Sequence, residues 1–433
     1  MTERGLYIHV PFCATRCGYC DFNTYTPQEL ADDSASTLNS AARGNTIDGY
    51  LDALERELEL AVSLWEPRSK EEGGSAVDTV FFGGGTPSML GAEGLTRALR
   101  AIKRTFGLTA GAEVTTESNP ESTNPEFFAA LREEGFTRIS LGMQSAAGHV
   151  LKVLERQHTP GRSVAAAREA LAAGFDHVNL DLIYGTPTET DADLLKSLEA
   201  VVSAGVDHVS AYSLIVEDGT AMARKVRRGE FPAPDEDVLA DRYRMIDQFL
   251  TDAGFEWYEV SNWAKPGGEC RHNLVYWRSA QWWGAGPGAH GCVRLRTSAE
   301  LVAADSRVMG TQANGGAGGE FSGLTRLVNA KRPATYWQGL MGRGGVEPEI
   351  PASVVTLEQL SHADVATERV MLGLRLREGL DLGDLRQTAE LDEVLKRYQR
   401  LGLANVEGTK LMLTDEGRYL ADGIVTDIVL SQE

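Results

Sequence analysis

Short runs of β-branched and aromatic residues alternate with longer amphipathic stretches through the first half of the chain. Such short runs, rich in Val, Ile, Tyr and Phe, are typical of buried strands. Six predicted strands follow one another, at residues 7–10, 77–82, 113–118, 138–142, 177–183 and 208–214. Between the first three, residues 47–65 and 91–107 repeat apolar positions every three or four residues, as one face of a helix does.

This alternation of strands and helices predicts a parallel sheet, because parallel neighbours are joined by crossovers that are usually helical. Six strand–helix repeats are fewer than the eight of a closed barrel. We therefore expect an α/β fold whose core, residues 1–220, is a partial, curved (βα)6 barrel. Residues 221–355 are expected to extend this barrel.

The pattern changes over residues 356–433. Residues 366–379 and 391–402 have helical periodicity, and residues 403–417 predict a hairpin that precedes a last helix. Helices followed by a hairpin predict a winged-helix-like C-terminal module. Asp and Glu outnumber Lys and Arg in this segment, so a docking or lid role is favoured over DNA binding.

Composition narrows the classes of function. The chain is 42% hydrophobic and 24% charged, as globular proteins are, and its formal net charge of −20 argues against nucleic acid as a partner. The N-terminus has no signal-peptide pattern and no apolar run is long enough to span a membrane. We expect a cytoplasmic protein, with surface insertions at the small, polar stretches 31–46 and 312–323.

Three of the five cysteines, Cys13, Cys17 and Cys20, lie directly after the first predicted strand in a CxxxCxxC pattern. Cysteine thiolates hold [4Fe–4S] clusters, normally four to a cluster, so three would leave one iron open. Zinc is the alternative, but a structural zinc site needs four ligands and the chain has no second CxxC pair. Clustering on one loop argues against incidental core cysteines and against a disulfide framework.

A glycine triplet, Gly83 to Gly85, follows the second predicted strand in FFGGGTPS. Glycines let a backbone approach a ligand closely, although a tight turn would explain the triplet equally well. Polar residues occupy equivalent places on later strands: Glu117, Gln144 and Asp181. Each of these alone would more often be a structural polar group. Their shared position at the ends of successive strands favours a ligand site.

Together these motifs resemble the radical SAM superfamily, whose members carry CxxxCxxC after the first strand of a partial barrel and a glycine-rich motif after the second. The segments YIHVPFC, FGGGTPS, ESNP, SLGMQS, LERQHT and DLIYGTPTET resemble its coproporphyrinogen-III-oxidase-like branch, over about residues 5–425. The resemblance implies a [4Fe–4S] cluster on Cys13, Cys17 and Cys20, with S-adenosylmethionine on the open iron. It also implies these S-adenosylmethionine-binding residues: Tyr7, Tyr19, Gly84, Gly85, Thr86, Glu117, Gln144, Arg156 and Asp181.

Two places distinguish the oxidases of this branch from its heme chaperones. Oxidases carry CxxxCxxCxC, and here Phe22 stands where the extra cysteine would be. Residues 270–278, CRHNLVYWR, contain HNxxYW, which resembles the chaperone signature. A neutral imidazole is a common axial ligand of heme iron, so His272 is the expected heme ligand, with Cys270 and His290 as weaker candidates. Without the motif, a histidine beside aromatic residues would more often belong to the core.

The resemblance therefore implies a chaperone that binds heme and transfers it to acceptor hemoproteins such as respiratory cytochromes, and we assign no catalytic residue. Two alternatives stay open. One is an oxygen-independent coproporphyrinogen III oxidase, and the other is a radical SAM enzyme with a non-tetrapyrrole substrate, which leaves HNxxYW unexplained. Peripheral membrane contact and a homodimer also stay open.

Overall fold

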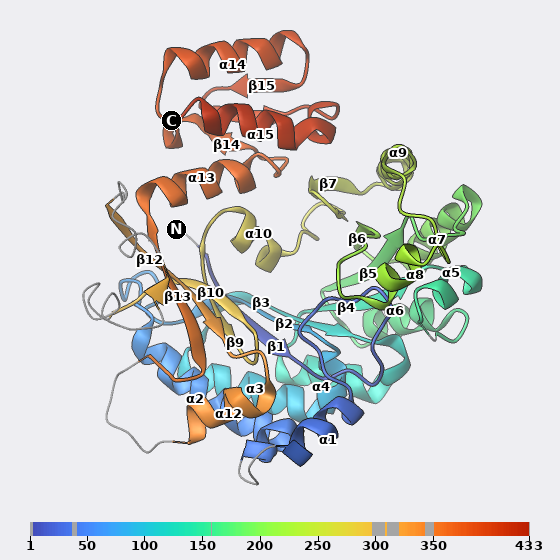
Figure 1. The fold of residues 1–433 in the computed structure, drawn as a ribbon, viewed down its shortest axis with the longest axis vertical. Helices are drawn as coiled ribbons and strands as arrows, with labels where there is room; N and C mark the ends of the chain where they lie inside the picture. Colours follow the sequence, from blue (N-terminus) through green and yellow to red (C-terminus); the bar gives the residue numbers. More distant parts are fainter. Residues whose placement is uncertain are drawn as a thin grey trace.

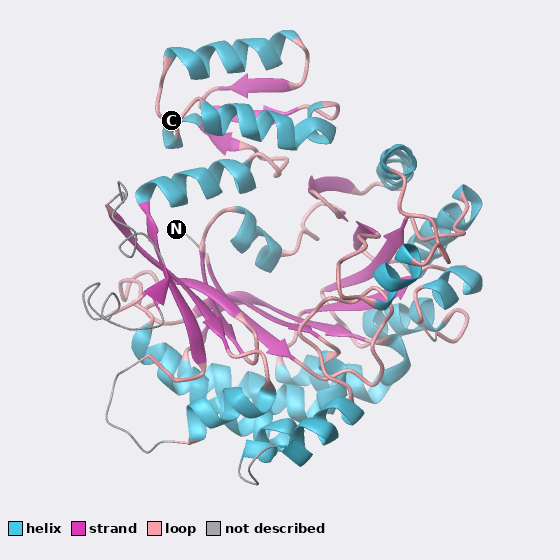
Figure 2. Ribbon diagram, in the orientation of Figure 1, coloured by secondary structure: helices cyan, strands magenta, loops and turns pink. Residues whose placement is uncertain are grey.

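The computed structural model describes residues 3–36, 41–156, 158–296, 308–309, 320–342 and 350–432. Within these residues the main body is a curved sheet of thirteen strands, with helices packed along its convex side (Figures 1 and 2). At its centre are parallel strands in chain order: β1 (Arg4–Val10), β2 (Val77–Gly84), β3 (Leu108–Ser118), β4 (Arg138–Gln144), β5 (His177–Tyr184) and β6 (His208–Ser213). The predicted partial barrel is confirmed.

The register of these strands brings their carboxyl ends to one rim of the sheet. Val10 of β1 pairs with Gly84 of β2, and Ser118 of β3 pairs with Leu141 of β4. Because every strand runs in the same direction, residues that follow the strands meet along this rim. The opposite rim gathers the residues that begin the strands.

Further strands widen the sheet on both sides. Beyond β6 lie β8 (Asn262–Ala264) and β7 (Glu256–Glu259), both antiparallel to their neighbours. Beyond β1 lie, in order, β9 (Gln281–Ala285), β10 (His290–Arg294), β12 (Phe321–Asn329), β13 (Val354–Ser361) and β11 (Val308–Met309). Strand β9 is parallel to β1, so β1 has a partner on each edge.

The helices follow the predicted pattern. The layer against the sheet contains α2 (Ile47–Leu64), α3 (Gly91–Thr105), α4 (Pro125–Glu134), α6 (Arg162–Ala172) and α7 (Asp191–Ala204). Helix α2 is capped by Thr46, whose hydroxyl accepts a hydrogen bond from Gly49 N at 3.1 Å, and it buries Leu51, Leu54 and Leu58. The remaining helices of the body are α1 (Pro27–Ser36), α5 (Gly148–Val153), α8 (Ala221–Arg227), α9 (Glu236–Asp252), α10 (Arg271–Trp277) and α12 (Pro333–Met341).

The C-terminal module has its own hydrophobic core, built around Leu374, Leu391 and Ile428. Its elements are α13 (His362–Gly373), β14 (Leu380–Asp381), α14 (Ala389–Arg400), the hairpin of β15 (Ala404–Glu407) and β16 (Lys410–Leu413), and α15 (Ala421–Leu430). The predicted boundary at residue 356 falls inside β13, which pairs with β12. We therefore place the start of the module at α13, whose N-cap Ser361 forms a capping box with Asp364.

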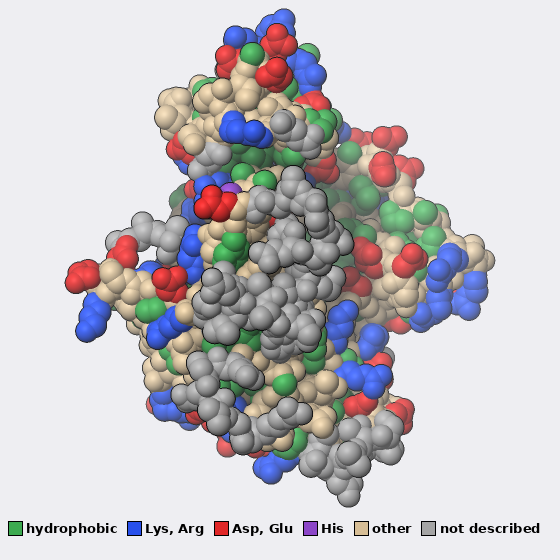
Figure 3. Space-filling view, turned by 60° about the vertical axis from the view of Figure 1, so that its left-hand side comes forward, with side chains coloured by type: hydrophobic (Ala, Val, Ile, Leu, Met, Phe, Trp, Pro, Cys, Tyr) green, Lys and Arg blue, Asp and Glu red, His purple; other side chains and the backbone are tan. Residues whose placement is uncertain are grey.

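The face of the molecule drawn in Figure 3 carries charges of both signs. In the space-filling view, acidic and basic side chains are interspersed, and hydrophobic side chains gather in the recess below the C-terminal module (Figure 3). The predicted insertion 31–46 is partly regular, because it contains the end of α1 and the 3-10 helix Ala41–Asn45. Of the second predicted insertion, residues 312–319 lie outside the described residues. Among those described, no helix is both long and apolar enough to cross a bilayer.

Candidate functional site

A cavity of about 450 Å³ opens at the rim where the parallel strands end. Most of the site residues predicted from the sequence line it: Cys13, Cys17, Tyr19, Cys20, Gly84, Gly85, Thr86, Glu117, Gln144, Arg156 and Asp181. Two predicted residues, Tyr7 and His272, do not. The structure thus brings the cysteine motif, the glycine motif and the strand-end polar residues to one place.

The cysteine loop is held by backbone hydrogen bonds at both ends. Cys13 N donates to Tyr25 O at 3.0 Å, and Met222 N, at the start of α8, donates to Gly18 O at 2.7 Å. All three thiols are partly buried, and burial raises the pKa of both Cys13 and Cys20. A bound cation would therefore be needed to keep these groups as thiolates at neutral pH.

The three thiols of the loop are the type of ligand that iron–sulfur clusters use. Across the described part of the chain, no three His, Cys, Asp or Glu side chains lie close enough to share one metal ion.

Gly84 and Gly85, at the end of β2, allow the backbone to turn and to pass close to neighbouring residues. Gly84 has a φ of 108°, and a Cβ there would lie 2.6 Å from the ring of His9. A Cβ on Gly85 would lie 2.6 Å from Phe12 O and 3.1 Å from Cys13 Sγ. The turn therefore passes directly beneath the cysteine loop with no room for a side chain.

Replacing Gly85 by alanine should consequently destabilise the protein by about 1–3 kcal/mol, because Phe12 O cannot yield without moving the cysteine loop. Urea unfolding of the variant and the parent protein measures the difference. Gly148→Ala is the matched control, since a Cβ at that helical position meets nothing within 4 Å. Equal stability of the Gly85 and Gly148 variants would contradict this account of the turn.

Two partly buried carboxyl groups, those of Glu117 and Asp181, form one side of the cavity. Burial, and then the neighbouring Asp181, raise the pKa of Glu117 to about 8, and Glu117 Oε2 accepts a hydrogen bond from Gly84 N at 3.2 Å. Burial also raises the pKa of Asp181, which accepts hydrogen bonds from Ser140 Oγ at 3.1 Å and Asn179 Nδ2 at 2.7 Å. This side suits ligand groups that donate hydrogen bonds, above all cationic ones.

Unpaired polar atoms mark the rest of the lining. Within the described residues, Gln144 Oε1, Arg156 Nε and Ser118 Oγ are buried and have no hydrogen-bond partner. Buried polar atoms are nearly always paired, so each of these leaves a place for a ligand atom. Gln144 also has a φ of 61°, a conformation that a non-glycine residue rarely adopts. The set suits a ligand that carries a carboxylate, an amine and hydroxyl groups.

Tyr7 lies beside the cavity and not on it. Its hydroxyl group bonds His9 Nδ1 at 3.0 Å, and its ring lies near that of Phe81, with centroids 6.4 Å apart. His9 in turn bonds Asn23 O through Nε2 at 2.9 Å. Tyr7 is therefore linked to the segment after the cysteine loop only indirectly, through the hydrogen bonds of His9.

His272 lies toward the opposite rim of the barrel. Its Nδ1 is 2.8 Å from Thr79 Oγ1, near the start of β2, and its Nε2 is 2.8 Å from Tyr276 OH. The side chain is 1% exposed, and burial lowers its pKa to about 4, so the imidazole is neutral. Both ring nitrogens are occupied. In this conformation His272 is the hydrogen-bonded core residue that the sequence left as the alternative to a heme ligand.

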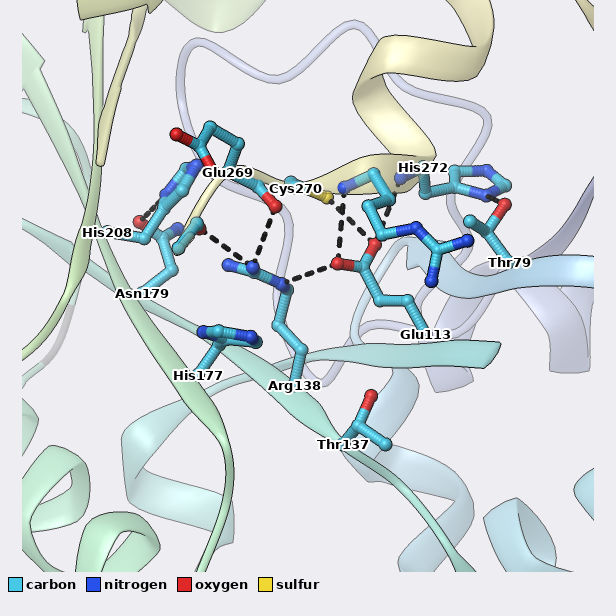
Figure 4. Close-up of polar contacts among 12 residues, drawn as sticks. Thr79, Glu113, Thr137, Arg138, His177, Asn179, His208, Glu269, Cys270 and His272 are labelled. Atoms are coloured by element: carbon cyan, nitrogen blue, oxygen red, sulfur yellow. Dashed lines mark hydrogen bonds and ion pairs between the residues drawn. The ribbon is translucent and has the colours of Figure 1, made fainter. Parts of the chain in front are cut away.

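A buried ion pair holds the start of α10, the helix that carries His272, in place (Figure 4). Glu113 accepts hydrogen bonds from the backbone N–H groups of Arg271, at 3.1 Å, and His272, at 2.9 Å. Arg138 Nε donates to Glu113 at 3.0 Å, and its Nη2 donates to the carbonyls of residues 268 and 269. The weaker candidate Cys270 is also buried here, with Sγ 3.5 Å from Glu113. These contacts explain why α10 lies in the barrel interior.

Sequence reasoning missed part of the cavity wall. Tyr212 and Ser213 at the end of β6 line it, as do Ser118 and Ser140 on β3 and β4. The strand-end rule could have found Tyr212 and Ser213, because β6 was itself predicted. At the mouth, Phe22 and Ile215 are 61% and 63% exposed, which the sequence does not indicate.

Comparison with known proteins finds relatives over nearly the whole chain. Residues 7–201 match the radical SAM superfamily, and residues 360–420 match the HemN C-terminal domain. The heme chaperone HemW of Mycobacterium tuberculosis is 50% identical over 425 residues, covering 98% of this chain and 94% of that protein. The heme chaperone HemW of Escherichia coli is 36% identical, over 67% of this chain and 70% of that protein.

A solved structure matches over nearly the whole chain. Coproporphyrinogen III oxidase (HemN) from Escherichia coli, described as a radical SAM enzyme, has a TM-score of 0.74 and covers 99% of this chain and 90% of its own. Its sequence identity is 22%, so this match establishes a common fold and nothing about the reaction.

Proposed function

Because this chain belongs to the HemW family of the radical SAM superfamily, we propose that it is a heme chaperone, which binds heme and transfers it to acceptor hemoproteins such as respiratory cytochromes. The observation that carries the proposal is the 50% identity to HemW of Mycobacterium tuberculosis over nearly the full length of both chains. HNxxYW at residues 272–277, and Phe22 in place of a fourth cysteine, support it further.

We propose that Cys13, Cys17 and Cys20 bind a [4Fe–4S] cluster and that the adjoining cavity binds S-adenosylmethionine. Such a cluster, when bound, supplies an iron without a protein thiolate, to which the amino and carboxylate groups of that ligand can bind. Arg156, with its free Nε, suits the carboxylate, and Glu117 suits hydroxyl or amino groups. The residues Tyr19, Gly84, Gly85, Thr86, Gln144 and Asp181 complete the proposed contacts.

Glu117 gives this proposed site a dependence on pH. With a pKa of about 8, the carboxyl group is mostly protonated at neutral pH, so it can donate a hydrogen bond as well as accept one. A cationic ligand group beside it favours the ionised form. Binding of a sulfonium or ammonium group would therefore release a proton from Glu117.

The proposed heme ligand is His272, which must leave its present contacts before it can bind iron. Iron can take a ring nitrogen only after the bond from that nitrogen to Thr79 or Tyr276 breaks and the ring leaves its stack on Phe81, whose centroid is 5.3 Å away. Heme binding would thus require α10 to move from its seat. We expect heme to bind in a slow step set by that movement.

A heme titration tests the function. Offered to the anaerobically purified, cluster-loaded protein, hemin should give a shifted Soret band, and His272→Ala should remove the shift. The matched control is His149→Ala, because the side chain of His149 is 52% exposed and far from α10 in sequence. A shift that persists unchanged in His272→Ala would show that the ligand is another residue.

The same preparation separates the chaperone from the oxidase. Incubated with coproporphyrinogen III, S-adenosylmethionine and a reductant, a chaperone should yield no protoporphyrinogen IX. Product formation would contradict the proposal, as would the absence of any spectral response to hemin.

A further inference from the structure

We propose that a buried chain of hydrogen bonds couples the cavity to α10, so that a ligand at Asp181 and a ligand at the HNxxYW segment change each other's affinity. The proposal rests on the proposed function for the two ligands, S-adenosylmethionine and heme. The hydrogen bonds of the chain are all present in the structure. Its three middle residues, Asn179, His208 and Tyr258, are not among the residues proposed to bind either ligand.

The chain runs through the barrel interior, from the strand-end rim to the first residue of the α10 segment. Asn179 Nδ2 is 2.7 Å from Asp181 Oδ1, and Asn179 Oδ1 is 2.7 Å from His208 Nδ1. His208 Nε2 is 2.8 Å from Tyr258 OH, which is 3.3 Å from the backbone N of Cys270. Cys270 is the N-cap residue of α10. Figure 4 shows Asn179 and His208 side by side at one end of the polar cluster and Cys270 near its centre, close to Glu113.

The two ends of the chain fix its direction. The backbone N–H of Cys270 can only donate, and Asp181 Oδ1 accepts from Asn179 Nδ2. Asn179 Nδ2 also lies 2.6 Å from Ser140 Oγ and 3.0 Å from Ser210 Oγ, so the NH2 group faces these oxygens and the amide oxygen faces His208.

The direction continues through the imidazole. His208 is fully buried, and burial lowers its pKa well below the usual value, so the ring is neutral with a single N–H, on Nδ1. Its Nε2 must then accept the Tyr258 proton, which leaves the Tyr258 oxygen to accept from Cys270 N–H. Every bond donates toward Asp181, and bonds in such a series strengthen one another.

A small second cavity follows the same path. It has a volume of about 50 Å³ and shares Glu117, Ser140, Asp181 and Tyr212 with the main cavity. Its far wall includes Cys270 and Asn273 of the α10 segment. The small cavity, whose lining is mostly polar, therefore adjoins both the ligand cavity and the residues at the start of α10.

The physical basis of the coupling is competition for one carboxylate. A ligand group that donates a hydrogen bond to Asp181 competes with Asn179 for the carboxylate, and this weakens the hydrogen bond between Asn179 and Asp181. Because the bonds of the chain polarise one another, each bond from there back to Cys270 is weakened as well. Helix α10 is the element with two arrangements, seated with His272 buried or displaced with His272 open to iron. A weaker bond at Cys270 favours the displaced arrangement, so S-adenosylmethionine should strengthen heme binding. We expect a factor of about five or more, equal in both directions.

Amide hydrogen exchange tests the coupling without heme. In the cluster-loaded protein, S-adenosylmethionine should speed exchange across residues 270–277. Tyr258→Phe removes one hydroxyl from the chain and should abolish this response while leaving the affinity for S-adenosylmethionine unchanged, because Tyr258 does not line the main cavity. Tyr243→Phe is the matched control. The Tyr243 hydroxyl donates to Val260 O, between β7 and β8, but takes no part in the chain of hydrogen bonds. An intact response in Tyr258→Phe would overturn the proposal.

Hemin titrations with and without S-adenosylmethionine provide the second test. The hemin dissociation constant should fall on adding S-adenosylmethionine in the parent protein and in Tyr243→Phe, and should not change in Tyr258→Phe. Equal constants in the parent protein would overturn the coupling, although the chaperone function would stand. If hemin fails to bind at all, the proposed function fails, and the exchange experiment still decides whether the chain connects the two ends of the barrel.

Discussion

Simultaneous replacement of Cys13, Cys17 and Cys20 by alanine is expected to abolish binding of iron and sulfide. The three thiols are the cysteine side chains on the cavity, and the other two, Cys270 and Cys292, are buried elsewhere. Thiolates supply the bonds that hold a [4Fe–4S] cluster, and without them the loop offers no comparable ligand. Iron and acid-labile sulfide, measured after anaerobic reconstitution, should fall from about four of each per chain to background levels.

The same experiment has a control in Cys292→Ala, which removes a buried thiol from β10 and should keep full iron and sulfide. The triple variant should retain its fold, because the loop is also held by backbone bonds to Tyr25, Leu154 and Met222. Circular dichroism checks this. Iron and sulfide at the parent level in a folded triple variant would refute the cluster assignment.

Arg138→Met is expected to lower the free energy of unfolding by about 3–5 kcal/mol, the usual cost of leaving a buried charge without its partner. Arg138 is 2% exposed and Glu113 is 5% exposed, and Arg138 also satisfies the carbonyls of residues 268 and 269. Arg278→Met is the control, because its pairing with Glu378 is bidentate but about 41–45% exposed and so contributes little. Urea unfolding compares the three proteins; similar losses in both variants would contradict the assignment.

The difference in the free energy of unfolding between the parent protein and Arg138→Met should depend on pH because of Glu113. Burial alone would raise the pKa of Glu113, but Arg138 and the N–H groups of His272 and Arg271 hold it below its usual value. A lowered folded-state pKa stabilises the protein above the unfolded-state value of about 4.5, and this stabilisation is lost as the pH falls through the folded-state value. The gap between the parent protein and Arg138→Met should therefore narrow in acid. A gap that stays constant down to the acid transition would argue against an ionised Glu113.

The central fold could be predicted because its signals are local. All six predicted strands form, since each is a short β-branched run between helical stretches, and their parallel order follows from the crossovers. Most of the cavity could be predicted for the same reason. Gly84 and Gln144 end their strands, and Glu117 and Asp181 lie in the last four residues of theirs. Such positions on successive parallel strands meet at one rim whatever the details of packing.

What sequence could not supply depends on contacts between distant segments. The burial of Trp283, which is 2% exposed, follows from the place of β9 in the sheet, beside β1. The motif HNxxYW does not reveal that His272 is buried, because its hydrogen bonds to Thr79 and Glu113 join segments some 160 to 190 residues apart. Tyr7 sits beside the cavity because the alternation along β1 turns it toward His9 and Phe81.

The position of β1 between β2 and β9 has a consequence for biosynthesis. Its second neighbour, Gln281–Ala285, is translated about 270 residues after β1 itself. Until that segment leaves the ribosome, one edge of β1 has no partner, and the loop that carries the three cysteines follows an open strand edge, which is prone to pair with other chains. A nascent chain that ends at residue 220 contains every cysteine of the motif and β1 to β6, yet lacks the strand that closes the N-terminal edge. The sheet, and with it the edge next to the cysteine loop, is therefore completed late in synthesis, after β1 to β6 have been translated.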